Sequence, residues 1–173
     1  MRTIYRVGAD QQLIEMHETP YETEDMLQAL LERHPGLLSN ADRSDDGNQT
    51  CLLIQREMGV PDSAHSGARW SLDHLFVTPG GKPVLVEVKR SSNTQIRREI
   101  VGQMLDYAAN ATRYWPPGKL RSHFEQRCAN DGTDPAMVFD EWLGGGVDLD
   151  AFWSRVDEHL QNGEIRLIFL ADR

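Results

Sequence analysis

The sequence is poor in cysteine and lacks long apolar runs, and each absence excludes a class of protein. Cys51 and Cys128 are too few for a disulfide framework and lack the spacing of a zinc site, so two reduced thiols are expected. No apolar run approaches the ~18 residues of a membrane-spanning helix. Residues 1–6 contain no apolar stretch of the kind that a secretory signal requires. We therefore expect a cytoplasmic protein.

Positive charge is also scarce. The 173 residues include 18 Lys and Arg against 27 Asp and Glu, a formal net charge of -9. This balance excludes a uniformly basic surface that coats nucleic acid, so any nucleic-acid contact must be local. The basic residues do cluster in two places, Lys89, Arg90, Arg97 and Arg98 in the first and Arg113, Lys119 and Arg121 in the second. The glycine patterns of ATP, dinucleotide and serine-hydrolase sites are absent, so none of these activities is supported.

Turn residues and apolar spacing predict an alternation of strands and helices. The expected strands cover residues 3–7, 13–17, 50–56, 70–77, 83–89 and 164–170. The expected helices cover residues 24–34, 95–112, 120–129, 135–143 and 149–160. Thr23 is the expected N-cap of the first helix, which Pro35 ends. This order predicts a single α/β domain over residues 1–173, with a mixed central sheet flanked by helices and an N-terminal hairpin over residues 1–20.

The last predicted strand, residues 164–170, has the composition of a buried strand. It is expected to lie in the core and to widen the sheet. A core strand rarely closes a chain so abruptly. We therefore expect the sequence to be a fragment of a longer protein, with an additional domain or a partner subunit.

The hairpin of the strands over 70–77 and 83–89 carries the candidate chemistry. Pairing Val77 with Pro83 across the loop places Asp73 opposite Glu87, and alternation puts Lys89 on the same face. The apolar residues of the other face are Leu72, Phe76, Val84, Val86 and Val88. On this register the apolar set faces the core and the acidic residues face outward.

Two opposed carboxylates repel each other, and a bound divalent cation removes that repulsion. Carboxylate oxygens are the ligands that Mg²⁺ prefers, and it commonly takes one or two of them. Lys89 could orient a metal-bound water or neutralise charge on a phosphate. The alternative is that Asp73, Glu87 and Lys89 are ordinary charged residues on the solvent side of a hairpin.

From about Glu24 to Tyr107 the sequence resembles the PD-(D/E)XK nuclease superfamily, on Asp73, the glycine-containing turn, the strand Val-Leu-Val-Glu-Val-Lys and the helix that follows. The resemblance implies a restriction endonuclease-like fold, with Asp73 and Glu87 binding Mg²⁺ or Mn²⁺ and Lys89 assisting. Pro61-Asp62 matches the letters of the motif but is expected in a loop away from Glu87. The resemblance does not cover residues 113–146, which we treat as a helical insertion that contacts substrate or a partner.

Gln103 and Tyr107 match the Q-x-x-x-Y element of the RecB-like branch of this superfamily. At i and i+4 they share one helix face. The resemblance implies that they help to position the active site and the bound strand. The alternative is that Tyr107 simply packs under the sheet.

An acidic residue on the helix before the motif strands often completes the metal site in such nucleases. Glu24 fits this pattern, with Asp25 and Glu22 as substitutes. The alternative is that Glu24 and Asp25 only complement the dipole of the helix N-terminus. Arg90, Arg97 and Arg98 are expected to contact phosphates.

Two functions follow as hypotheses. The first is a Mg²⁺-dependent endonuclease or exonuclease that cleaves DNA, in prokaryotic defence or repair, for which a homodimer is one expected assembly. The second is a catalytically inactive module with the same fold that binds DNA or protein, which the charge of -9 favours. The intact set of Asp73, Glu87 and Lys89 favours the first.

Overall fold

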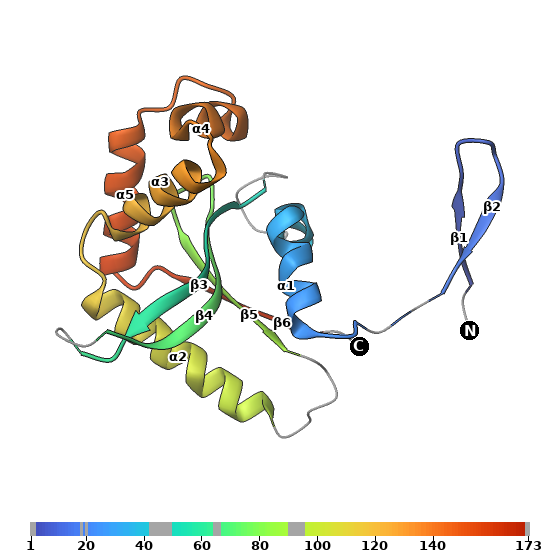
Figure 1. Cartoon of the computed structure of the whole chain (residues 1–173). Helices are drawn as coiled ribbons and strands as arrows, with labels where there is room; N and C mark the ends of the chain where they lie inside the picture. The colour runs from blue at the N-terminus through green and yellow to red at the C-terminus, as the bar shows by residue number, and fades with distance from the viewer. Residues whose placement is uncertain are drawn as a thin grey trace.

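Four strands form the central sheet, in the order β3-β4-β5-β6 (Figure 1). They are β3 (Leu52–Pro61), β4 (Ala68–Val77), β5 (Pro83–Lys89) and β6 (Arg166–Ala171). β4 is antiparallel to β3 and β5, whereas β6 is parallel to β5. The structure, a computed structural model, describes residues 3–17, 19, 21–41, 50–63, 67–89 and 96–171, without the side chains of 39–41 and 96–98. The mixed sheet predicted from the sequence is confirmed.

Helices cover both faces of this sheet (Figure 1). On one face lies α1 (Glu24–Arg33), followed by a short 3-10 helix over Pro35–Ala41. The helices on the other face are α2 (Ile96–Tyr114), α3 (Lys119–Asp131), α4 (Pro135–Leu143) and α5 (Leu149–Gln161). Each helix buries an apolar stripe against the strands, which is why neither face of the central strands is left to solvent.

The smaller core lies under α1. Leu27 and Leu31 pack against Phe76, Val84 and Val86 of the sheet. The helix begins where the sequence predicts, because the Thr23 side chain accepts a hydrogen bond from the backbone N–H of Met26. The cap and the buried stripe together fix the position of the first turn of α1 beside the ends of β4 and β5.

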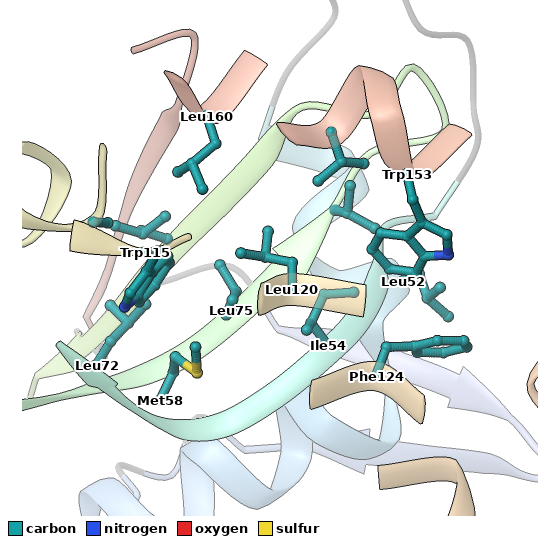
Figure 2. Close-up of a cluster of buried hydrophobic side chains, with 14 of the residues drawn as sticks. Leu52, Ile54, Met58, Leu72, Leu75, Trp115, Leu120, Phe124, Trp153 and Leu160 are labelled. Carbon is teal, nitrogen blue, oxygen red and sulfur yellow. The ribbon is translucent and has the colours of Figure 1, made fainter. Parts of the chain in front are cut away.

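The larger core lies under α2 to α5 (Figure 2). Its buried members include Leu120, Phe124 and Cys128 of α3 and Phe139 of α4. These residues belong to the segment 113–146, which the sequence suggests to be an insertion. Its helices therefore share the core of the sheet and do not form a separate layer.

The N-terminal hairpin is confirmed, with β1 (Ile4–Val7) antiparallel to β2 (Leu13–Met16). Every residue of both strands is exposed, and Figure 1 shows the hairpin standing away from the sheet. Both cysteines are buried, and neither forms a disulfide. Among the described residues, no helix is long and apolar enough to cross a membrane.

The sequence expectation that the last strand is buried is wrong. β6 is not a core strand: its residues are half-buried or exposed, because it is the outermost strand of the described sheet and pairs only with β5. In α2, Val101 and Leu105 are 47% and 57% exposed. The stripe that faces the core is instead Met104, Tyr107 and Ala111, which lies to the side of Val101 and Leu105 on the helix.

Candidate active site

The register of the β4–β5 hairpin is the one that the sequence predicts. Val77 pairs with Pro83, and the ladder continues to His74 and Val86. One position further, Asp73 reaches the level of Glu87. At this level a side chain, and not the backbone of β4, pairs with β5: Oδ2 of Asp73 accepts a hydrogen bond of 2.7 Å from the backbone N–H of Val88. Asp73 is thereby held against β5.

The strict alternation of side chains fails at this point. Leu72 was expected to face the same side as Phe76, but it packs in the larger core with Leu75. His74, two residues from Leu72, lies toward α1, where its Nε2 is 3.1 Å from the backbone oxygen of Gln28. The alternation of β4 side chains between the two faces of the sheet is therefore interrupted at Asp73, at the end of the β4–β5 ladder.

The expectation that the acidic residues face outward is also wrong. Glu87 is only 2% exposed and Asp73 is half-buried. The cause is α2, which covers the face of the sheet that the hairpin alone would leave to solvent. The candidate site is consequently a recessed one.

Residues from β5 and α2 contact one another around Glu87. Lys89 Nζ lies 2.8 Å from Oε1 of Glu87. Nε2 of Gln103 donates to the same oxygen at 3.3 Å and also to the Tyr107 hydroxyl, which donates to the backbone oxygen of Ser71 at 3.3 Å. Tyr107 is buried, so it both packs under the sheet and belongs to this network. Gln103 and Tyr107 thus orient the carboxylate of Glu87, in contact with it and with β4.

One oxygen of Glu87 has no partner. Its Oε2 is buried and makes no hydrogen bond with any described residue. A buried charged oxygen without a partner is costly, because it has lost its water and gained nothing in return. The unpartnered Oε2 is therefore the atom of this site that most needs a ligand.

The ionisation of the site reflects its burial. Burial raises the pKa of Asp73 and of Glu87. The charge of Asp73 raises the pKa of Glu87 further, and the charges of Glu24 and Glu57 raise that of Asp73 further. Burial alone would lower the pKa of Lys89, but its hydrogen bond with Glu87 and the nearby carboxylates raise it. Lys89 is accordingly a cation at neutral pH. Any added positive charge would favour the ionised forms of Asp73 and Glu87.

Glu24 reaches this site from the other face of the sheet. As the first residue of α1 it lies on the side of the smaller core, opposite α2. Its charge nevertheless raises the pKa of both Asp73 and Lys89. Glu24 is therefore an electrostatic neighbour of the pair at the end of the strands, and it does not share their face.

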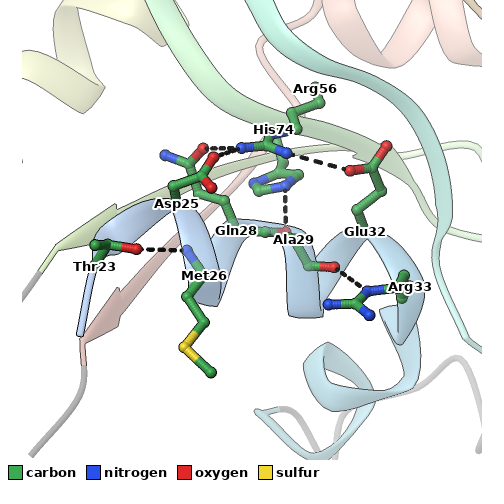
Figure 3. Close-up of polar contacts among 9 residues, drawn as sticks. All are labelled: Thr23, Asp25, Met26, Gln28, Ala29, Glu32, Arg33, Arg56 and His74. Carbon is green, nitrogen blue, oxygen red and sulfur yellow. Dashed lines mark hydrogen bonds and ion pairs between the residues drawn. The ribbon is translucent and has the colours of Figure 1, made fainter. Parts of the chain in front are cut away.

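The two substitutes for Glu24 are placed differently. The Asp25 carboxylate forms an ion pair with Arg56, which also bonds to Gln28 and Glu32 (Figure 3). Glu22 is exposed before the helix. Arg56 is a residue that sequence reasoning missed: by linking β3 to three side chains of α1, it fixes the helix that carries Glu24.

Glu57 was missed as well. Its φ of 54° lies in the left-handed region, which is rare for a residue other than glycine. Arg56 and Met58 on either side of it face opposite sides of the sheet, toward α1 and the larger core. The Glu57 charge raises the pKa of Asp73. Nothing in the sequence signals this conformation. It arises where the alternation of side chains between the two faces of the sheet is interrupted in both β3 and β4.

We expect Glu57→Gly to stabilise the protein by about 1 kcal/mol, because glycine adopts the left-handed conformation without the steric cost of a side chain. Glu57→Gln keeps that cost but removes the charge that disfavours ionised Asp73, so a smaller gain is expected. Urea unfolding of both variants at neutral pH separates the backbone effect from the charge effect. A loss of stability in Glu57→Gly would show that the Glu57 side chain makes a stabilising contact that outweighs the backbone strain.

The remaining candidates divide into two groups. Arg90 lies outside the described residues, and the side chains of Arg97 and Arg98 on α2 are not described. Asp62 of the Pro61-Asp62 sequence forms an ion pair of 2.7 Å with Arg69. Asp62 lies after the end of β3, but the expectation of a loop is wrong for Pro61, which is the last residue of β3 and pairs with Ala68.

The residues present fit a cation held by two carboxylates. Asp73 and Glu87 offer hard oxygen ligands, and Mg²⁺ usually completes its shell with waters and substrate oxygens. Within the described ranges, no three His, Cys, Asp or Glu side chains gather closely enough to hold a metal ion by themselves. Comparison with known proteins gives no further guide: no family model, no curated protein and no solved structure matches the chain.

Proposed function

We propose that the chain is a metal-dependent nuclease of the PD-(D/E)XK type, with a restriction endonuclease-like core, which hydrolyses phosphodiester bonds in DNA. The observation that carries the proposal is the buried, unpartnered Oε2 of Glu87 beside the half-buried Asp73 and the cation of Lys89. Two carboxylates brought together under a helix, with a raised pKa each, are disfavoured without a cation. A site with this composition suits phosphate chemistry, in which positive charge must meet developing negative charge.

Each residue has a distinct part in the proposed reaction. Asp73 and Glu87 would hold Mg²⁺ or Mn²⁺, which when bound supplies an activated water and offsets phosphate charge. Lys89, held by Glu87, places its ammonium group where it can stabilise negative charge on the phosphate. Gln103 and Tyr107 keep the Glu87 carboxylate in one orientation. Glu24 adds negative potential that favours cation binding.

A non-catalytic module is the second candidate, and one observation favours it. Oε1 of Glu87 is already neutralised by Lys89 at 2.8 Å, an arrangement that a binding domain could keep as a structural ion pair. The buried carboxylate pair favours the nuclease, because a module freed from catalysis has no use for two like charges in one recess. The two functions are separated by their response to metal.

We expect Mg²⁺ to raise the melting temperature of the wild type by several degrees, because a ligand at 100 times its Kd stabilises the native state by about 2.7 kcal/mol. Glu87→Gln should lose both that shift and DNA cleavage. It should be as stable as the wild type without metal, or slightly more so, since the raised pKa of Glu87 means that folding disfavours the ionised form.

Glu158→Gln on the exposed surface of α5 is the matched control, and it should keep the metal response and the cleavage. Thermal shift with and without Mg²⁺ and nicking of labelled single- and double-stranded DNA provide the two readouts. Equal metal shifts in the wild type and Glu87→Gln would place the ion elsewhere. Absence of cleavage by the wild type on DNA and RNA would favour the non-catalytic module.

A further inference from the structure

A second recess lies beyond the candidate active site, where the end of α2 and the start of α3 meet the last residues of β3 and the first residue of β4. Its volume is about 420 Å³. The side chains that give it chemical character are Tyr114 and Trp115 of the α2 end and Lys119 and His123 of α3. The proposed reaction uses none of them.

The charge of this recess is positive in a protein that is acidic overall. Lys119 and His123 are its charged or basic members, one helical turn apart, and no carboxylate is among the described residues that line it. Neither forms an ion pair with a described residue. Burial and the charge of Lys119 lower the pKa of His123, with no acidic neighbour to offset them. Lys119 is therefore the cation of the recess, and His123 is a neutral imidazole beside it at neutral pH.

Arg121, which lies between these two residues in sequence, shows the contrast. It forms ion pairs with Glu125 at 2.7 Å and Asp150 at 2.6 Å. The second basic cluster of the sequence is thus split: Arg121 is neutralised by the protein, whereas Lys119 is directed to the recess. A cation left without a protein partner in a hollow is available to an anionic ligand.

Two aromatic side chains, Tyr114 and Trp115, form part of the wall of the recess. Trp115 is buried and fixed by a hydrogen bond of 3.3 Å from its Nε1 to the backbone oxygen of Gly59. Tyr114 is half-buried, and the Arg113 guanidinium lies 5.6 Å from the centre of its ring. Aromatic rings beside a cationic groove are the combination by which proteins hold unpaired bases of a strand.

α2 connects this recess to the candidate active site. Gln103 and Tyr107 contact Glu87 and β4 at one level of the helix, and Tyr114 lies eleven residues after Gln103, about 16 Å along the axis. The Trp70 ring of β4 lies 6.1 Å from that of Tyr107. A strand that crosses the site along α2 and β4 would reach the recess within a few nucleotides.

We propose that this recess binds one unpaired nucleotide of a nucleic-acid strand, with Lys119 and His123 on its phosphate and the rings of Tyr114 and Trp115 beside its base. The inference rests on the proposed nuclease function and specifies its substrate as single-stranded, or as a duplex with an unpaired end. An acidic peptide would satisfy Lys119 but would leave the aromatic wall unused.

The test measures binding of a labelled oligothymidylate of about 12 nucleotides, within the usual site size of such proteins, in EDTA so that no cleavage occurs. Lys119→Gln is expected to weaken binding at least fivefold and to lower the salt dependence by about 0.7, the value for one phosphate contact on a single strand. Tyr114→Leu should weaken binding about fivefold or more without changing the salt dependence. The matched control is Lys82→Gln, an exposed lysine in the loop at the other end of β4.

Competition by dTMP and by inorganic phosphate distinguishes a nucleotide site from a plain anion site. We expect dTMP to compete with the strand at lower concentration than phosphate. Equal competition by the two, or equal affinities of Lys119→Gln and Lys82→Gln, would overturn the proposal. Strand binding that depends on Lys119, without any cleavage in Mg²⁺, would support the nucleotide-binding recess and overturn the proposed nuclease function. If Lys119→Gln bound and cleaved the strand at wild-type levels, the nuclease function would stand and the role of the recess would be overturned.

Discussion

Lys89→Ala is expected to slow DNA cleavage by about 10² to 10³-fold, the usual cost of removing one group that stabilises charge in the transition state. Binding of the uncleaved strand should change little, because Lys89 acts mainly as negative charge develops on the phosphate. The raised pKa of Lys89 keeps it protonated at neutral pH, so it is expected to act as a cation and not as a general base. Gel-shift affinity and nicking rate at one salt concentration measure the two effects separately.

The same substitution leaves the buried Glu87 carboxylate without its cation, which should also destabilise the protein. The double variant Lys89→Ala with Glu87→Gln removes both charges and should recover the stability but not the cleavage. Lys82→Ala is the control for loss of an exposed lysine. A nicking rate for Lys89→Ala equal to that of the wild type, with the fold intact by circular dichroism, would remove Lys89 from the proposed mechanism.

Phe139→Ala is expected to destabilise the protein by about 3 to 5 kcal/mol, a large part of the stability of a domain of this size. Phe139 is 2% exposed and packs its ring against four others, those of Phe124, Trp142, Phe152 and Trp153, at centroid distances of 5.0 to 5.6 Å. The cavity left by its removal would therefore lie where α3, α4 and α5 meet.

Met137→Ala on the same helix is the control, because Met137 is 71% exposed and its loss should cost little. Urea unfolding followed by tryptophan fluorescence and by far-UV circular dichroism gives the free energy of unfolding for each. If Phe139→Ala melted α4 alone and left the sheet as stable as before, residues 113–146 would be a peripheral insertion and not part of the common core.

The hairpin and its charged residues could be predicted because they depend on short-range rules. The five-residue loop fixes the pairing of Val77 with Pro83, and the period of two then brings Asp73, Glu87 and Lys89 together. The face shared by Gln103 and Tyr107 follows equally from the helical repeat. This shared face brings Gln103 into contact with Glu87.

The remaining features of the site depend on packing between distant segments. Glu87 is buried because α2 lies over it, and a hairpin considered alone would leave it exposed. The left-handed Glu57 and the opposite facing of Leu72 and His74 arise where two strands bend together, which no local pattern records. The ion pair of Arg56 with Asp25 joins β3 to α1 across residues that are far apart in sequence.

The parallel pairing of β5 with β6 also bears on the order in which the chain folds. β3, β4 and β5 can pair as soon as their short turns close, whereas β6 can join only after the whole segment from α2 to α5 has been folded or looped out. Closing so long a loop is entropically costly and slow compared with forming a hairpin. During synthesis, β5 therefore pairs with β4 on one side while its other side stays unpaired until the ribosome has released β6. We expect hydrogen exchange during refolding to protect the amides of β4 before those shared by β5 and β6.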